Sequence, residues 1–145
     1  MQLKFTKINP GAIVPKYGTD FSAGLDMSAC TDHDIAVAPG CTATIMTGIA
    51  LEIPEGYFGM LCPRSGIAAK FGVTLLNSPG IIDSDYRGEV RAILINHSRT
   101  PFIVSHGMRV AQLIICPFKM AALEESENIS ESVRGNRGFG STGLY

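Results

Sequence analysis

Two carboxylates, an aromatic ring and a guanidinium group lie close together in the segment 80–90, Gly-Ile-Ile-Asp-Ser-Asp-Tyr-Arg-Gly-Glu-Val. A carboxylate with an ordinary pKa is ionised at neutral pH, so Asp83 is suited to act as a general base. Asn77, just upstream, carries an amide that both donates and accepts hydrogen bonds, as reading the edge of a base requires. The alternative is a polar hairpin in which Asp83 and Asp85 accept backbone hydrogen bonds.

An anion site is indicated by the segment 63–66, Pro-Arg-Ser-Gly, which opens a short stretch with helical character. Backbone N–H groups at a helix start attract anions, and the Arg64 and Ser65 side chains add donors beside Gly66. An ordinary helix start with Ser65 as N-cap would explain Ser65. It would not explain Arg64, because a positive charge at a helix N-terminus is unfavourable unless an anion offsets it.

A single glutamine, Gln112, interrupts the apolar run 110–114. A buried amide needs hydrogen-bond partners, so Gln112 is predicted either to bridge structural groups or to contact a ligand. The residue types leave both roles open.

The C-terminal part of the chain is polar and then rich in glycine. Residues 134–143 contain four glycines, two arginines, a hydroxyl pair and the aromatic ring of Phe139. Such a segment does not hold a rigid conformation alone, which predicts a flexible arm over 124–145. A plain disordered terminus is one interpretation. A phosphate-binding loop is the other, because glycine N–H groups and arginines bind phosphate oxygens.

Short strand-like runs separated by turn residues must position these side chains. They are predicted at residues 3–8, 34–38, 42–47, 49–53, 57–62, 73–76, 89–96, 102–104 and 110–116, with one short helix at 65–71. Turns every 8–12 residues or so are typical of a β-sandwich or barrel. Alternating β–α units are not seen, which argues against a doubly wound nucleotide-binding fold. We therefore predict an all-β, antiparallel double-sheet jelly roll over 1–123, followed by the arm 124–145.

Composition narrows the classes of function. The chain has 145 residues with 12 Lys or Arg and 13 Asp or Glu, so its net charge of -1 argues against a general nucleic-acid binder. No apolar run approaches the ~18 residues of a membrane span, and the N-terminus does not resemble a signal peptide. The four cysteines form no paired motif, which predicts buried free thiols in a reducing, cytoplasmic environment. The three histidines share no ligand spacing, which argues against a zinc site.

Taken together, five segments resemble the motifs of the trimeric deoxyuridine triphosphatase (dUTPase) family. They cover 23–29, beginning Ala-Gly-Leu-Asp, and then 63–73, 77–90, 107–114 and 134–143, in the family's order. The most specific are Gly-Ile-Ile-Asp-Ser-Asp-Tyr-Arg-Gly and Arg-Gly-Asn-Arg-Gly-Phe-Gly-Ser-Thr-Gly. The resemblance implies a jelly-roll homotrimer that hydrolyses dUTP to dUMP and pyrophosphate with Mg2+. It also implies that the enzyme keeps uracil out of DNA and supplies dUMP for thymidylate synthesis.

The resemblance further implies roles for the matching residues of the body. Asp83 would activate the attacking water and contact the deoxyribose 3′-hydroxyl. Asn77 falls where uracil is read, and Tyr86 matches the aromatic ring that leaves no room for a 2′-hydroxyl. The remaining matches are the phosphate-binding Arg64, Ser65 and Gly66, Gln112 near the α-phosphate and water, and Asp26, which acts on the metal through waters.

In the arm, the resemblance implies that a neighbouring subunit closes the site. Phe139 would lie over uracil, and the other substrate-binding residues would be Arg134, Gly140, Ser141 and Thr142. One active site would combine motifs from three subunits. The chain departs from the family at position 137, where Arg137 replaces the usual glycine. If the backbone at this position has a positive φ, a side chain there costs conformational free energy. The alternative is that Arg137 adds a contact to phosphate.

Two rival functions fit part of the sequence. The dCTP deaminases resemble this chain around the third motif, but they carry a catalytic Glu five residues beyond that motif's glycine. This chain has Ile93 there, which transfers no proton. A non-catalytic jelly-roll module for binding or assembly is the other rival, because fold alone does not fix function. The hydrolase is favoured because Arg64, Asp83, Tyr86, Gln112 and the arm occur together.

Overall fold

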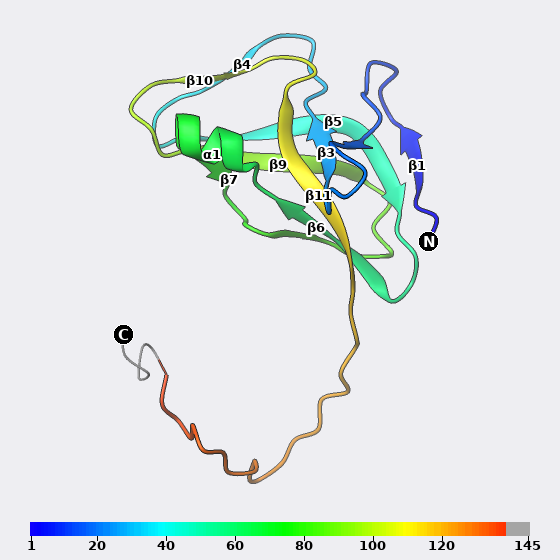
Figure 1. The fold of residues 1–145 in the computed structure, drawn as a ribbon, viewed down its shortest axis with the longest axis vertical. Helices are drawn as coiled ribbons and strands as arrows, with labels where there is room; N and C mark the ends of the chain where they lie inside the picture. Colours follow the sequence, from blue (N-terminus) through cyan, green and yellow to red (C-terminus); the bar gives the residue numbers. More distant parts are fainter. Residues whose placement is uncertain (139–145) are drawn as a thin grey trace.

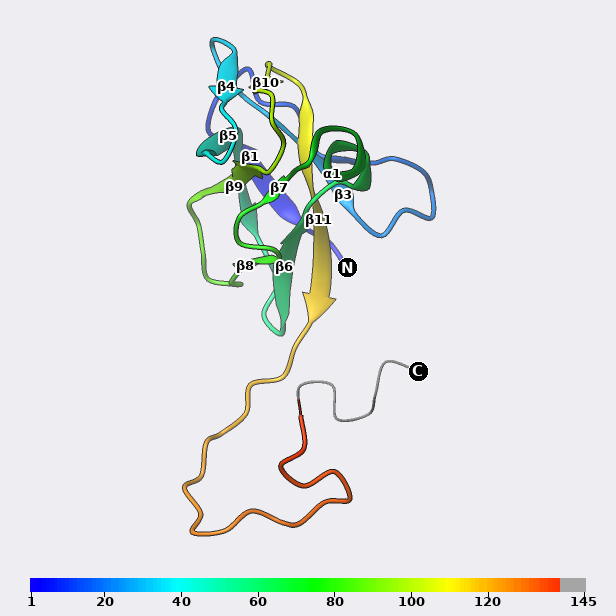
Figure 2. The ribbon, with the colours of Figure 1, turned by 90° about the vertical axis from the view of Figure 1, so that its left-hand side faces the viewer.

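Two antiparallel sheets form the body of the molecule in the computed structural model, which describes residues 1–138 (Figure 1, Figure 2). One sheet has four strands in the order β1-β5-β9-β7, and the other has five in the order β2-β3-β11-β6-β8. Strands β4 and β10 form a separate two-stranded ribbon. The predicted all-β jelly roll with one short helix is confirmed.

Every predicted strand and the predicted helix are present, and three short strands are additional. β2, β3 and β8 were outside the prediction because two to four residues are too few to show a reliable period. In chain order the elements are β1 (Lys4–Lys7), β2 (Lys16–Tyr17), β3 (Leu25–Ser28), β4 (Ile35–Val37), β5 (Thr42–Glu52), β6 (Tyr57–Cys62), α1 (Ser65–Phe71), β7 (Val73–Leu75), β8 (Gly80–Ile82), β9 (Glu89–Asn96), β10 (Phe102–Val104) and β11 (Arg109–Pro117).

The core lies between the two larger sheets, and both contribute to a single apolar cluster. In β9 the buried side chains alternate along the strand and end at Asn96, as expected for one face of a pleated strand. Asn96 is fully buried, and its amide nitrogen donates to the carbonyls of Val37 and Thr100, each at 2.8 Å. The buried amide therefore fixes the loop after β9 to β4 without an unsatisfied polar atom.

A glycine predicted to end a strand instead lies inside β5. Residues 42–47 and 49–53 were expected as two strands, but one strand continues through Gly48, where the pairing with β9 changes register. Gly48 has φ +68, and a Cβ there would lie 2.7 Å from the Ala12 Cβ. The Gly48 N–H donates to Glu89 Oε1 at 2.6 Å, and the Thr47 hydroxyl donates to the Val90 carbonyl at 2.6 Å. Side chains thus satisfy the backbone groups that the irregularity leaves unpaired.

The cysteines differ from the prediction in burial. All four are free, but only Cys30 is buried, whereas Cys41 is exposed and Cys62 and Cys116 are half-buried. Cys41 lies next to Gly40 in a turn between β4 and β5, outside the core. Burial raises the pKa of the Cys30 and Cys62 thiols, which keeps them protonated at neutral pH.

Beyond β11 the chain leaves the body as a segment without helix or strand up to residue 138 (Figure 1). The boundary at residue 123 stays a prediction. Within residues 1–138 no helix combines the length and the apolarity that crossing a membrane would require.

Candidate active site

The first of two candidate half-sites is a cavity of about 190 Å³, the hairpin pocket, beside β8 and the loop that follows it. Asn77, Asp83 and Tyr86 all line it, together with backbone of Gly80 and apolar side chains of β6 and β8. Three residues that the sequence predicted as substrate contacts are therefore brought together. A Cβ on Gly80 would meet the Asn77 amide nitrogen at 3.2 Å, so glycine allows Asn77 to lie close to the strand.

Hydrogen bonds within the loop 83–89 hold Tyr86 in place. Its N–H donates to the Asp83 carbonyl at 3.2 Å, and its hydroxyl donates to the Glu89 carbonyl at 3.1 Å. The Arg87 guanidinium donates to the Ser84 carbonyl at 2.6 Å, which closes the loop from the other side. A Cβ on Gly88 would lie 2.4 Å from the Tyr86 hydroxyl, so the ring packs directly on the glycine backbone.

Asp83 is exposed at the mouth of the hairpin pocket. It also lines a wider open cavity with Asp85 and Arg87. The structure records no hydrogen bond from residues 1–138 to the carboxylate of Asp83 or Asp85. The alternative of a polar hairpin stabilised by these two carboxylates is therefore not supported.

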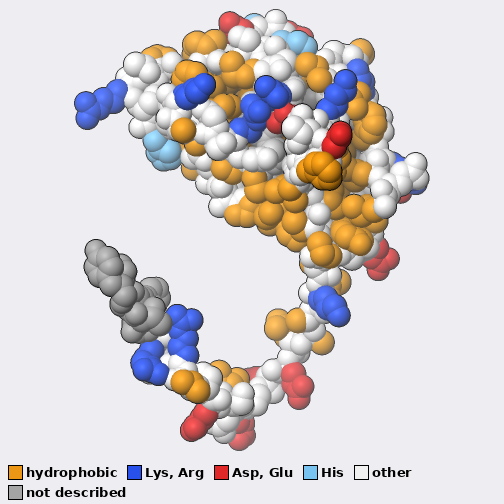
Figure 3. Space-filling view, viewed as in Figure 1, with side chains coloured by type: hydrophobic (Ala, Val, Ile, Leu, Met, Phe, Trp, Pro, Cys, Tyr) orange, Lys and Arg blue, Asp and Glu red, His pale blue; other side chains and the backbone are white. Residues whose placement is uncertain are grey.

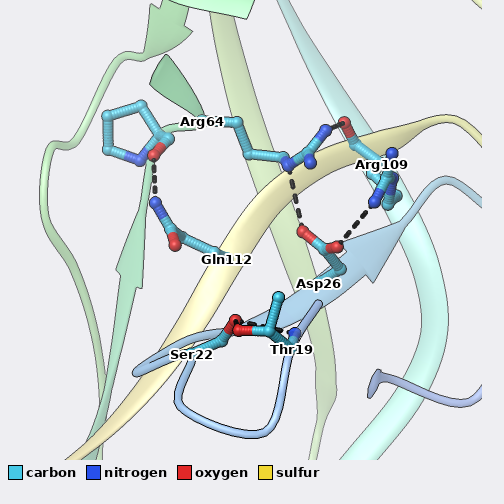
Figure 4. A network of polar contacts seen from close by, with 7 residues as sticks. Thr19, Ser22, Asp26, Arg64, Arg109 and Gln112 are labelled. Atoms are coloured by element: carbon cyan, nitrogen blue, oxygen red, sulfur yellow. Dashed lines mark hydrogen bonds and ion pairs between the residues drawn. The ribbon is translucent and has the colours of Figure 1, made fainter. Parts of the chain in front are cut away.

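The second half-site is a cavity of about 370 Å³, the arginine pocket, between α1, β11 and the loop 18–24 (Figure 4). Asp26, Arg64, Ser65, Gly66 and Gln112 line it. The segment 63–66 was predicted as an anion site, and the resemblance added Gln112 near the α-phosphate and Asp26 on the metal. Arg109 and the hydroxyl side chains of Thr19 and Ser22 line it as well, and the sequence analysis did not select these three residues. One signal for Arg109 was available in the sequence, since it lies in the family-like segment 107–114, three residues before Gln112.

A shared carboxylate connects the two arginines of this pocket (Figure 4). Arg64 Nε lies 3.0 Å from Asp26 Oδ1, and Arg109 Nη1 lies 3.0 Å from Asp26 Oδ2. Arg64 Nη1 also donates to the Arg109 carbonyl at 3.4 Å. Within residues 1–138, Asp26 therefore supplies the negative charge that offsets Arg64 at the helix start.

The helix start differs from the expectation for Ser65. Arg64 is the N-cap, with extended φ and ψ, and Ser65 is the first helical residue. No side chain caps the first turn. The interpretation of Ser65 as N-cap is therefore wrong, and Ser65 instead lines the arginine pocket.

Gln112 bridges two segments of the pocket wall. Its Nε2 donates to the Pro63 carbonyl at 2.9 Å, which ties β11 to the residue before Arg64 (Figure 4). A Cβ on Gly24 would lie 2.8 Å from Gln112 Oε1, so a larger residue there would push the amide out of its present position. The structural role predicted for Gln112 is confirmed, and the amide oxygen remains at the pocket.

The two pockets share no lining residue, and Arg134 lines neither of them. In the arm, Arg137 donates from Nε to the Arg134 carbonyl at 3.1 Å and from Nη2 to the Val133 carbonyl, which closes a turn. Phe139, Gly140, Ser141 and Thr142 lie outside the described residues. No three His, Cys, Asp or Glu side chains form a metal-binding group within residues 1–138.

Known proteins match this chain over almost its whole length. A family model described as dUTPase matches residues 11–143. The deoxyuridine 5'-triphosphate nucleotidohydrolase of Syntrophotalea carbinolica is 48% identical over 142 residues, which cover 98% of this chain and 97% of the relative. The protein of the same name from Rickettsia bellii is 47% identical over 132 residues, which cover 91% and 88%. A solved structure of the Staphylococcus bacteriophage 80alpha dUTPase with dUPNHPP has a TM-score of 0.87 at 27% identity and covers 99% of each chain.

The family model covers residues 11–143, and the two relatives are 48% and 47% identical to the chain over nine-tenths or more of its length. The chain belongs to the dUTPase family and is a hydrolase of dUTP.

Proposed function

We propose that the chain hydrolyses dUTP to dUMP and pyrophosphate by attack of a water molecule on the α-phosphate, with Asp83 as the general base. The placement of Asp83 carries this proposal. Its carboxylate is exposed, accepts no hydrogen bond from residues 1–138, and lies beside Asn77 and Tyr86. An ionised carboxylate without an internal partner is available to take a proton from water.

The hairpin pocket would select the base and the sugar. Asn77 and the backbone near Gly80 offer both donors and acceptors, as recognition of a uracil edge requires. The Tyr86 ring is held by its own hydrogen bonds and packs on Gly88, so it forms a fixed wall. A fixed ring discriminates against a sugar with an added 2′-hydroxyl, because the ring does not move to make room for it.

The arginine pocket would bind the phosphates. Arg64 presents a planar set of donors suited to phosphate oxygens, and Ser65 and Gly66 line the pocket next to it. The Gln112 amide, fixed by Pro63, is placed to orient the α-phosphate or the attacking water. Positioning and charge stabilisation supply most of the rate enhancement in phosphoryl transfer, so no protein nucleophile is needed.

The donors of the arginine pocket fit Mg2+ held mainly by the substrate. Among residues 1–138, Asp26 is the one carboxylate that lines this pocket. Mg2+ keeps several waters and commonly takes one or two carboxylates together with substrate phosphates. Asp26 would hold the ion through water, and the bound ion would neutralise negative charge on the phosphates.

A homotrimer with shared active sites would join the two pockets. Support comes from the apolar face, which we define as Phe58, Met60, Ile81, Ile114 and Cys116. Met60 pairs with both Ile114 and Ile81, and Phe58 pairs with Cys116, so their side chains share one face of the five-stranded sheet. None of its residues belongs to the core cluster, and hydrophobic side chains gather on the surface over the lower parts of β6 and β11 (Figure 3). The face adjoins Gln112 of the arginine pocket and includes Ile81 of the hairpin pocket. Packing between copies would cover it.

The arm would complete the site from a neighbouring subunit. Arg134 would reach the outer phosphates, and Phe139, Gly140, Ser141 and Thr142 would close over the substrate. The support is sequence composition together with the extended course of residues 118–138 away from the body (Figure 1). Ordering of the arm on the substrate would couple specificity to catalysis.

The rival functions are less well supported. Ile93 lies in the middle of β9, paired with Thr44, and offers no proton at the position where a deaminase needs one. A non-catalytic module has no use for a carboxylate held without partners beside an amide and a fixed aromatic ring. The proposed cellular role is to remove dUTP, which keeps uracil out of DNA, and to supply dUMP for thymidylate synthesis. The four free cysteines support a cytoplasmic location.

The test is incubation of the purified chain with Mg2+ and, separately, dUTP, dCTP, UTP and dTTP, with products identified by chromatography. We expect dUMP and pyrophosphate from dUTP alone. Deamination of dCTP would show that the argument from Ile93 is wrong. A folded protein without turnover of any of these nucleotides would support the binding module instead.

A further inference from the structure

Asp26 holds two guanidinium groups at once, one on each carboxylate oxygen (Figure 4). We propose that Arg109 is a second cationic residue for the polyphosphate part of the substrate, and that Asp26 keeps Arg64 and Arg109 oriented until the polyphosphate displaces it. This inference rests on the proposed function, because it concerns the same phosphate pocket.

The charge balance of the pocket favours this role over a purely structural ion pair. The charged side chains that line it are Asp26, Arg64 and Arg109, so one carboxylate faces two cations and the pocket carries a net charge of +1. A structural pair needs one arginine per carboxylate. The second arginine leaves an uncompensated charge that an anion entering the pocket would neutralise.

Arg109 is also the more available of the two cations. Its side chain is 56% exposed, against 27% for Arg64, and Asp26 Oδ2 is the single acceptor recorded for it within residues 1–138. Arg64, by contrast, has a second partner, because its Nη1 donates a hydrogen bond to the carbonyl oxygen of Arg109. The remaining guanidinium N–H groups of Arg109 are therefore available to make the first contact with a phosphate oxygen, before the polyphosphate displaces Asp26.

The pairing also explains why two long side chains hold defined positions at a half-exposed site. Without Asp26, both arginines would lose an anchor and adopt many rotamers, and ordering them would oppose substrate binding. The same carboxylate repels an incoming polyphosphate. Asp26 therefore has two opposing effects on affinity, orientation of the arginines and competition for them.

The first experiment measures the dissociation constants of dUMP and of the non-hydrolysable triphosphate dUPNHPP in EDTA, without added metal. Arg109→Gln is compared with the wild type, with Arg109→Lys, and with Arg99→Gln, a control in an exposed loop that lines neither pocket. We expect Arg109→Gln to raise the dissociation constant of dUPNHPP about tenfold or more, which is the usual scale for the loss of a charge-assisted hydrogen bond. The affinity for dUMP should change little, and Arg109→Lys should restore part of the loss.

The second variant, Asp26→Asn, keeps an oxygen acceptor for one arginine but removes the negative charge. We expect metal-free dUPNHPP to bind about three- to tenfold more tightly, because charge repulsion and competition for the arginines both decrease. If Asp26 acted on a metal ion alone, its replacement would leave metal-free affinity unchanged.

The inference is overturned if Arg109→Gln leaves dUPNHPP binding unchanged, or weakens dUMP and dUPNHPP equally, which would indicate structural damage. It is also overturned if Asp26→Asn does not tighten metal-free binding. Failure of the proposed function is a separate result, because it would appear as absence of dUTP hydrolysis by the wild type.

Discussion

Two aspartates of the candidate site have opposite surroundings. Asp26 forms ion pairs with two guanidinium groups, each at 3.0 Å, whereas the Asp83 carboxylate accepts no hydrogen bond from residues 1–138. A carboxylate that is held by cations suits an electrostatic role, and one without partners suits proton transfer. The different environments therefore support the roles proposed for the two residues.

Asp83→Asn should lower kcat by about 10²-fold or more while nucleotide affinity is kept, because the amide retains shape and polarity but takes no proton. Asp85→Asn is the matched control, since Asp85 is an exposed carboxylate two residues away that does not line the hairpin pocket. Steady-state turnover and binding of dUPNHPP measure the two effects. Near-normal turnover of Asp83→Asn would remove Asp83 from the mechanism.

Gly88→Ala should reduce the preference for dUTP over UTP about tenfold or more. The added Cβ would lie 2.4 to 2.9 Å from atoms of the Tyr86 ring and hydroxyl, so the ring must move from the wall that excludes a 2′-hydroxyl. The ratio of kcat/KM for dUTP and UTP measures the change. Tyr86→Phe is the comparison, because it loses the hydroxyl bond to Glu89 but keeps the ring. Unchanged discrimination in Gly88→Ala would contradict this role of the ring.

At the scale of elements, periodicity in the sequence located longer strands such as β9 because alternate side chains of such a strand must be buried. It failed at Gly48, since a glycine that permits a change of register inside β5 has the same sequence signal as one that ends a strand. The third motif was selected because its reactive residues are close in the chain. Arg109 was missed because its partner Asp26 lies 83 residues away, and only the pairing of β11 with β3 brings them together.

The arm is the element whose function depends least on the fold of the body. Deletion of residues 134–145 should leave the β body folded, because β11 ends at Pro117 and the core cluster contains no residue of the arm. Turnover should fall to a small fraction of the wild-type value, since Arg134 and the residues after it would no longer close the site. Circular dichroism and molecular mass in solution check the fold, and a dUTP assay checks turnover. Full activity of the truncated chain would refute the closing role.

At the scale of the whole molecule, the apolar face should control assembly. Ile114→Glu would place a charge at the centre of this face, between Asp26 and Gln112 on one side and Phe58 and Cys116 on the other. We expect a folded monomer with little dUTP hydrolysis, because burying an unpaired carboxylate in an interface is strongly unfavourable. Ile103→Glu is the control, since Ile103 is an exposed isoleucine on β10, outside the apolar face. Sedimentation analysis and turnover distinguish the two variants, and an Ile114→Glu trimer with normal activity would contradict the proposed interface.

The separation of the two pockets leads to a stricter test of shared sites. Asp83 lines one pocket and Arg64 the other, so Asp83→Asn and Arg64→Gln each disable a different half-site. If each active site takes its two halves from different subunits, a mixed trimer contains some sites in which both halves are intact. Random assembly of equal amounts of the two variants in a ring should restore about a quarter of wild-type turnover. Co-expression with two different affinity tags isolates the mixed trimers, in which one site of the three is intact, so this purified fraction should show about a third of wild-type turnover. If one chain supplied both halves, every site would keep one defect and the mixture would be as inactive as its components.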